Sequence, residues 1–215
     1  MKHFLITRVA VWQNEEFLKT FDIRDRIFHE FTLPSVQSQT NKIFEWLLLF
    51  DSEFPNKDMM EEYKKYWTVL ITNRWTSWVQ TTIDYINSVA YNEDYIITTR
   101  MDSDDVISPQ FIEKIQEHYK DHSAEQLLSL CTGSELDYNT GDIFKFEKKY
   151  SNPFISLREI PSEWIVTVNT KQHWQMEKEY ITKYMFTIHP MRTRILHWYN
   201  AARKEVLKWL EKLPN

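Results

Sequence analysis

Glycine is almost missing from this chain of 215 residues, which contains only Gly133 and Gly141. Two isolated glycines exclude both glycine-rich phosphate-binding loops, the G-x-G-x-x-G turn of dinucleotide-binding folds and the G-x-x-x-x-G-K-[ST] loop. If the protein handles a phosphorylated ligand, basic side chains or a metal ion must therefore hold the phosphates.

Cysteine, net positive charge and long apolar runs are also scarce. The single cysteine, Cys131, excludes an intrachain disulfide and a cysteine-rich zinc site, and it suits a reducing compartment. The formal net charge of −5 leaves no general basic field, so we expect no nucleic acid among the partners. No run approaches the ~20 apolar residues of a membrane-spanning helix, and no signal peptide is evident. We expect a cytoplasmic protein without a transmembrane segment, and peripheral association with the inner face of a membrane stays open.

A short, β-branched apolar run that ends in three carboxylates is the most informative feature present. Residues 95–99 predict a buried strand, and Asp102, Asp104 and Asp105 follow it. Adjacent carboxylates repel one another and resist desolvation, so we expect a cation or a donor-rich ligand beside them. Side chains two apart on an extended segment share a side, which would let Asp102 and Asp104 approach one hard cation. The pattern predicts a Mg²⁺ or Mn²⁺ site that also holds a diphosphate.

Two alternatives to this metal site compete for the carboxylate cluster. An EF-hand calcium loop is excluded, because apolar residues stand where that loop needs a ligand and a glycine. The second alternative is structural: Asp104 or Asp105 would cap a helix that begins near Pro109. Asp102 would then pair with Arg100. One acid could serve in this way, whereas three adjacent acids need more.

Alternation of apolar runs with amphipathic segments predicts an α/β fold. Strands are expected at residues 3–9, 44–50, 68–72 and 95–99, and helices at 25–39 (kinked or ending near Pro34), 59–67, 75–90 and 110–120. Later in the chain we expect a strand at 127–132, a hairpin turn at 137–142, a strand at 165–168 and a helix at 192–213. The order predicts a doubly wound, mostly parallel sheet with helices on both faces. Ligands bind beyond the carboxyl ends of such strands, where Asp51 and Asp102 would meet.

Several blocks of the sequence resemble one family. Residues 98–105, Thr-Thr-Arg-Met-Asp-Ser-Asp-Asp, resemble the D-x-D-D signature of rhamnosyltransferases with the GT-A glycosyltransferase fold. The resemblance extends to residues 26–40, residues 44–51, the run 153–157 and the pair His173-Trp174. It implies a single GT-A-like domain over 1–215, with a nucleotide-sugar-binding half at 1–125. An irregular acceptor half with a C-terminal helix would occupy 126–215.

The resemblance also implies a reaction. A sugar, L-rhamnose, would pass from a nucleoside diphosphate donor to a hydroxyl of a carbohydrate or glycan acceptor, by an inverting displacement. Asp104 would be the main metal ligand, and Asp102 would touch the donor ribose or the metal through water. Asp51 would lie near the donor base, and Arg8 and Arg100 would face the same pocket.

An inverting transfer needs a general base toward the acceptor hydroxyl. Glu159 is the first choice, and Glu163 and Asp137 are alternatives. Histidine is a common metal ligand. The candidates for a third metal ligand are His173, first, and then His189 and His197.

Two rival functions stay open. A nucleotidyltransferase would share the metal–diphosphate chemistry, but it normally carries a glycine-rich loop with a basic residue near its N-terminus, which this chain lacks. A non-catalytic carbohydrate-binding or degenerate transferase domain would keep the aromatic residues without needing the three carboxylates together.

Overall fold

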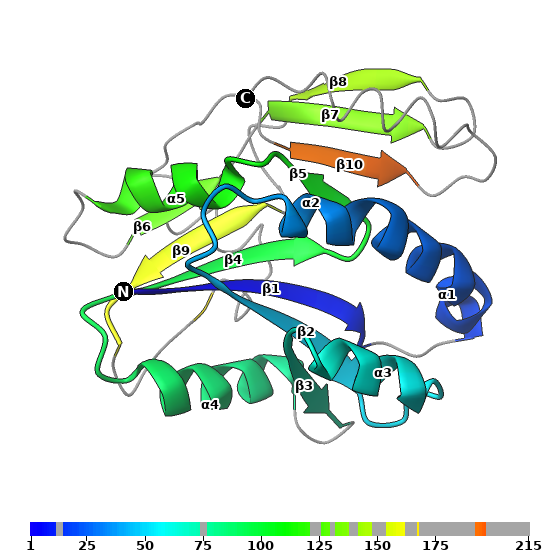
Figure 1. Ribbon diagram of the computed structural model, residues 1–215, viewed down its shortest axis with the longest axis horizontal. Coiled ribbons are helices and arrows are strands. Elements are labelled where there is room, and N and C mark those ends of the chain that lie inside the picture. The colour runs from blue at the N-terminus through cyan, green and yellow to red at the C-terminus, as the bar shows by residue number, and fades with distance from the viewer. Residues whose placement is uncertain are drawn as a thin grey trace.

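The computed structural model (Figure 1) describes residues 1–11, 15–73, 77–120, 126–129, 132–137, 142–147, 154–161, 167 and 192–196. Its elements, in chain order, are β1 (Lys2–Ala10), α1 (Glu15–Ile27), the π-helix η1 (Phe28–Thr32), α2 (Leu33–Gln37), β2 (Glu45–Asp51), α3 (Lys57–Lys64), β3 (Thr68–Thr72), α4 (Trp78–Ala90), β4 (Ile96–Asp102), β5 (Asp105–Ile107), α5 (Phe111–Lys120), β6 (Gln126–Ser129), β7 (Thr132–Asp137), β8 (Ile143–Glu147), β9 (Ile155–Glu159) and β10 (Arg192–Leu196). No helix within these ranges is long and apolar enough to cross a membrane.

A six-stranded sheet forms the centre of the molecule, in the order β3-β2-β1-β4-β9-β6. Strands β3, β2, β1 and β4 are parallel, whereas β9 runs antiparallel to both β4 and β6. The predicted strands at 3–9, 44–50, 68–72 and 95–99 are all present, and so is the mostly parallel sheet. Strand β4 extends further than expected and includes Asp102.

Two hydrophobic clusters lie on opposite faces of this sheet. In β2, Leu48 and Phe50 belong to one cluster, and Leu47 and Leu49 to the other. Side chains alternate across a strand, so a strand buried on both faces reads as an unbroken apolar run. The first cluster includes residues of η1, α2, α3 and α5, and the second includes residues of α4. Helices therefore cover both faces, as the sequence predicts.

A second, four-stranded sheet has the order β5-β10-β7-β8. Strands β7 and β8 form the antiparallel pair that the hairpin signal predicted. The predicted helix at 192–213 is wrong for its first residues, because 192–196 form β10, between β5 and β7. Thr193 and Ile195 are β-branched, and pairing with strands distant in sequence overrides the helical spacing. The rest of that predicted helix lies outside the described residues.

Two further local predictions need correction. The helix expected at 25–39 begins earlier, as α1, and is interrupted by η1, where Leu33 donates its N–H to the Phe28 carbonyl. The irregularity immediately precedes Pro34, which has no N–H to continue the helical pattern. The strand expected at 165–168 is wrong at Thr167, which lies in a turn with φ of 49°. The remainder of that strand lies outside the described residues.

Candidate functional site

The carboxyl ends of β1, β2 and β4 form one edge of the central sheet (Figure 1). Arg8 in β1 is in register with Asp102, the last residue of β4. On the other side, Asp51 ends β2 opposite Thr72, the last residue of β3. The predicted meeting of Asp51 and Asp102 at the carboxyl edge of the sheet is therefore correct at the level of the backbone.

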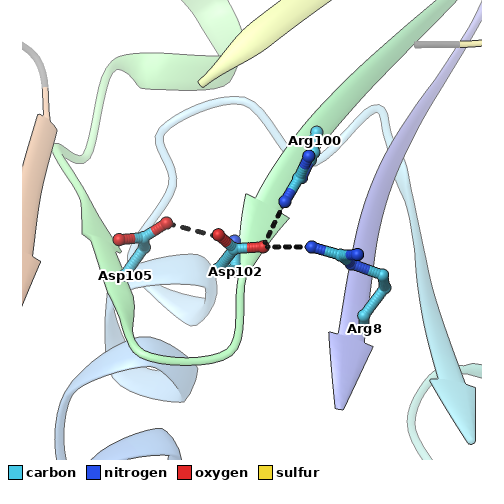
Figure 2. A network of polar contacts seen from close by, with 4 residues as sticks. All are labelled: Arg8, Arg100, Asp102 and Asp105. Atoms are coloured by element: carbon cyan, nitrogen blue, oxygen red, sulfur yellow. Dashed lines mark hydrogen bonds and ion pairs between the residues drawn. The ribbon is translucent and has the colours of Figure 1, made fainter. Parts of the chain in front are cut away.

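Asp102 is held by two arginines (Figure 2). Its Oδ1 accepts hydrogen bonds from Arg8 Nη2 at 3.3 Å and from Arg100 Nη2 at 3.1 Å. Burial would raise the pKa of Asp102, but the two guanidinium groups outweigh it and lower that pKa. The Asp102 side chain is 33% exposed. A charged and partly open network results, in which two cations already compensate one of the three acids.

The chain turns immediately after Asp102. Ser103 and Asp104 form the turn, and the Asp102 N–H donates to Asp105 Oδ2 at 3.1 Å. The prediction that Asp102 and Asp104 share one side of an extended segment is therefore wrong, because the extended backbone stops between them. Ser103, Asp104 and Asp105 are all buried. Asp105 closes the turn, so a structural role holds for one acid, and the pairing of Asp102 with Arg100 is also present.

Hydrogen bonds from residues 32–39, here called the brace, hold the acidic turn (residues 102–105) and the residues that follow it. Thr32 Oγ1 donates to the Ser103 carbonyl at 3.0 Å, and the Ile107 N–H donates to Ser35 Oγ at 3.3 Å. All four residues are buried. Sequence reasoning did not assign a role to Thr32 or Ser35, although both lie in the block 26–40 that carries the family resemblance.

Gln39 completes this brace. Its Nε2 donates to the Ser108 carbonyl at 2.7 Å and to the Ser35 carbonyl at 2.9 Å, while its Oε1 accepts from the Ile112 N–H at 3.0 Å. Ile112 lies in the first turn of α5, whose orphan N–H groups need acceptors. Gln39, rather than Asp104 or Asp105, is thus the side chain that supports the start of this helix. The only signal for it was again its place in the block 26–40.

Trp78, which lies within the helix expected at 75–90, is a further residue near the carboxyl ends of these strands. The Arg8 Cζ atom lies 5.2 Å from the centroid of the Trp78 ring, within the range of a cation–π contact. Trp78 begins α4, and the side chain of Ser77 caps that helix by accepting from the Gln80 N–H. Arg8 is therefore held between an aromatic ring and a carboxylate.

Asp51 stabilises its own turn. Its side chain is largely buried, and its Oδ1 accepts from the Glu53 N–H at 2.8 Å. The turn is further fixed by a backbone hydrogen bond from Phe54 to the Asp51 carbonyl. Asp51 lies at the predicted edge, with one oxygen committed to the loop that follows β2.

Glu159 is not brought to this edge. It pairs with Ile96, the first residue of β4, because β9 runs antiparallel to β4. Asp102 follows Ile96 by six positions along β4, which corresponds to roughly 20 Å. Glu159 is buried, and both of its carboxylate oxygens accept from the Thr167 N–H, at 3.0 and 3.2 Å. This placement opposes the prediction that Glu159 is the general base.

The remaining candidates are placed only in part. Asp137 ends β7 in the second sheet, with its backbone opposite Leu196. Glu163 and the candidate metal ligands His173, His189 and His197 lie outside the described residues.

The acidic turn can be compared with the needs of a divalent metal ion. Within the described ranges, no group of three His, Cys, Asp or Glu side chains is arranged to hold one. Nucleotide-linked Mg²⁺ or Mn²⁺ needs fewer, since one or two carboxylates and the substrate phosphates suffice. Asp104 and the partly exposed Asp102 supply hard oxygen donors of this kind. The donor set therefore fits a metal that is bound together with a diphosphate.

Solved structures with a similar fold come from S. aureus TarS. A crystal structure of TarS 1–349 has a TM-score of 0.52 and 13% identity, covering 91% of this chain and 60% of that chain. The same TarS fragment in complex with UDP has a TM-score of 0.52 and 12% identity, covering 91% of this chain and 61% of that one. This chain thus spans about 60% of the length of TarS 1–349. The likeness shows that the fold is GT-A-like, as expected.

Sequence comparisons identify the family. A comparison with curated proteins finds no match for the chain. A family model described as "Putative rhamnosyl transferase" matches residues 7–205, which include the arginines, the acidic turn and its brace. Since this match extends over most of the sequence, the chain belongs to the family described as "Putative rhamnosyl transferase".

Proposed function

We propose that this protein is a glycosyltransferase that moves a sugar, L-rhamnose, from a nucleoside diphosphate donor to a hydroxyl of a carbohydrate acceptor. The observation that carries the proposal is the convergence of Arg8 and Arg100 on Asp102 at the carboxyl edge of the parallel strands. Family membership supports the reaction class. The complex of TarS with UDP supports a nucleotide donor in a protein of similar fold.

Arg8 and Arg100 are the proposed diphosphate ligands. A guanidinium has five N–H donors in a planar fork, so an arginine that donates one N–H to a carboxylate can also bind phosphate oxygens. Asp102 and Trp78 fix the orientation of Arg8 before the donor arrives. This pre-organisation replaces the glycine-rich phosphate loop that the sequence lacks.

Asp102 and Asp104 are the residues that would hold a divalent metal. When bound, that ion would supply Lewis-acid compensation for charge on the diphosphate. The chain's own arginines act in the same direction, because the anomeric C–O bond breaks and negative charge builds on the leaving diphosphate. Fixed positive groups aimed at that charge stabilise the transition state more than the ground state.

We propose Asp137, rather than Glu159, as the general base. The pairs Asp105–Arg194 and Arg194–Glu135 place Asp105, β10 and Glu135 in one row across the second sheet. Asp137 follows Glu135 by two residues, toward the end of the sheet where β5 leaves the acidic turn. Its backbone lies two strands from β5, about 10 Å away at the usual strand spacing. In an inverting displacement, it would accept the proton of the acceptor hydroxyl.

Thermal unfolding with nucleoside diphosphates tests the donor site. UDP, GDP and dTDP are each added with and without Mn²⁺, at concentrations up to the millimolar range. A ligand at 100 times its Kd stabilises by about 2.7 kcal/mol, which raises the Tm of a chain of this size by about 5–10 °C. We expect a Mn²⁺-dependent rise with at least one nucleotide in the unmodified protein and in Lys114→Ala, and none in Asp104→Ala.

Absence of any nucleotide-dependent shift would contradict the donor site. A hydrolysis screen across nucleotide sugars then identifies the sugar and the base. Release of a nucleoside diphosphate from a rhamnose donor, ahead of donors that carry other hexoses, supports the L-rhamnose assignment.

A further inference from the structure

A groove with a volume of about 550 Å³ lies at the amino ends of β2 and β3. The proposed donor site lies at the carboxyl ends of the parallel strands. Glu45 and Thr68, the first residues of β2 and β3, line it. The last residues of those strands, Asp51 and Thr72, lie at the donor edge. The volume is within the range of small-molecule sites. The two sites are thus separated by the length of the strands.

One wall of the groove is aromatic. Tyr66 is 70% exposed, and its ring centroid lies 5.5 Å from that of Trp67. Trp67 in turn packs against Trp46, with centroids 5.3 Å apart, and against Tyr63, at 5.7 Å. The exposed ring of Tyr66 is therefore packed against Trp67, which in turn packs against the buried rings of Trp46 and Tyr63. Rings of this kind present apolar faces on which the C–H face of a sugar packs.

The groove is also basic, in a chain whose net charge is −5. Three lysines line it, Lys42, Lys64 and Lys65, against one carboxylate. Lys64 pairs with Glu61 at 2.6 Å, and Lys42 donates to the Gln37 carbonyl, so internal contacts account for these two. Among the described residues, no ion pair involves Lys65. Charge complementarity therefore favours a negatively charged occupant.

Glu45 is the single carboxylate that lines the groove, and two hydrogen bonds fix the position of its side chain. Its Oε1 accepts from Thr68 Oγ1 at 2.6 Å and from the Tyr85 hydroxyl. Both hydrogen bonds use the same oxygen, and no described residue donates to Oε2. A carboxylate oxygen held in this way is a suitable acceptor for a sugar hydroxyl.

We propose that this groove, here called the lysine groove, is a second binding site that takes an anionic sugar. The sugar ring packs on Tyr66, a ring hydroxyl donates to Glu45, and the phosphate or carboxylate substituent pairs with Lys65. No one of these three features selects this ligand class alone. An anion needs only the lysines, and a neutral sugar needs only the ring and the carboxylate. The proposal goes beyond the proposed transfer reaction and does not depend on it.

Calorimetric titration of the full chain tests the lysine groove. The probes are glucose 1-phosphate, glucose 6-phosphate and glucuronate, with glucose and inorganic phosphate as comparison ligands. We expect at least one anionic sugar to bind with a Kd of about 1 mM or tighter, and both comparison ligands to bind at least about tenfold more weakly. Lys65→Glu and Tyr66→Ala each weaken that binding at least about fivefold, an effect in the range of one lost charge pair or stacking contact.

Matched controls separate this site from others. Lys120→Glu changes an exposed lysine on α5, and Tyr91→Ala removes a tyrosine that is 60% exposed. Both are expected to bind the anionic sugar as the unmodified protein does. Asp104→Ala is expected to keep this binding while losing the nucleotide response, so failure of one site is distinguishable from failure of the other. No binding of any anionic sugar, equal binding of phosphate, or binding unaffected by both groove variants would each overturn the proposal.

Discussion

The two ends of strand β4 hold acidic side chains in opposite ways. At its carboxyl end, Asp102 is 33% exposed and is balanced by Arg8 and Arg100. Beside its amino end, Glu159 is buried, and the Thr167 N–H bridges both of its oxygens. The first arrangement is charged and partly exposed to solvent, whereas the second is buried and hydrogen-bonded to the backbone. The proposed donor site therefore coincides with the end of β4 whose acidic side chain is partly exposed and paired with arginines.

A buried neutral network lies near the amino end of β4, where Glu159 is paired with Ile96; this end is called the closed end here. The carboxyl end of β4, with Asp102, is called the open end. His3 Nε2 bonds Thr99 Oγ1 at 2.8 Å, Thr99 Oγ1 bonds Ser156 Oγ at 2.7 Å, and Gln116 lies 3.2 Å from His3 Nδ1. Burial lowers the pKa of His3 to about 3. His3, Thr99 and Ser156 are therefore buried without charge, whereas Asp102 at the carboxyl end of β4 is paired with charged arginines.

Among changes at the two ends of β4, removing an arginine beside Asp102 gives the largest expected effect. Arg8→Met takes one of two cations from Asp102 and from the diphosphate, and misplacement of groups at a reacting centre costs about 10²-fold in rate. We expect donor turnover to fall by at least that factor, with a change in Tm of only a few degrees. Lys114→Met, which removes an exposed lysine paired with Glu117, is the control and should keep full turnover. Equal turnover in the two variants would remove Arg8 from the donor site.

Acid should destabilise the closed end first. His3 stays neutral in the folded protein, while its unfolded form gains a proton below the ordinary pKa of 6.5, so stability falls as the pH drops from 6.5 toward 3. At 1.36 kcal/mol per pH unit, denaturant unfolding at pH 5 should show a loss of about 2 kcal/mol relative to pH 7.

The open end titrates in a different window. The pKa of Asp102 is lowered from 3.8, so its ion pairs contribute above that pH and are lost only as the pH falls through the lower value. Between pH 7 and pH 5, His3→Gln should therefore flatten the stability profile, whereas Asp102→Asn should leave its slope unchanged. A slope that His3→Gln does not alter would assign the acid sensitivity to other groups.

The smallest expected effect separates two candidate bases. Glu159→Gln keeps the shape of the side chain but weakens its charge-assisted hydrogen bonds to Thr167, at a cost of about 1 kcal/mol of stability. Turnover per folded molecule should stay within about twofold, because general base catalysis is worth 10²–10⁴-fold where it operates. Asp137→Asn should show a loss of that larger size. Loss of turnover in Glu159→Gln with retained Tm would restore Glu159 as the base and oppose the assignment of Asp137.

Most of the central sheet was predictable, because each parallel strand is a local apolar run bounded by polar residues. Once parallel order is assumed, the carboxyl ends must share an edge, which is why Arg8, Asp51 and Asp102 could be placed together. The direction of a strand is not a local property. Nothing in the residues of β9 indicates that it runs antiparallel to β4, and that reversal places Glu159 at the far end.

Several features depended on contacts between distant segments. The geometry expected for Asp102 and Asp104 assumed an extended chain, and a single turn at Ser103 removes it. Strand β10 exists because it lies between β5 and β7, and its own residues also fit a helix. The role of Gln39 could not be seen locally either, because its partners lie about seventy residues later in the chain.

That separation has a consequence for how the acidic turn forms during folding. The hydrogen bonds that join Thr32, Ser35 and Gln39 to the turn and to the residues that follow it, up to Ile112, span 69–73 residues. Contacts of such long range require closure of a large loop, whose entropy is lost before the contacts can compensate it. The turn that carries Asp102 and Asp104 therefore takes its final shape only when residues 32–39 and 103–112 have come together. A chain that has folded α5 and β4 without residues 32–39 lacks the hydrogen bonds that fix this turn and the start of α5.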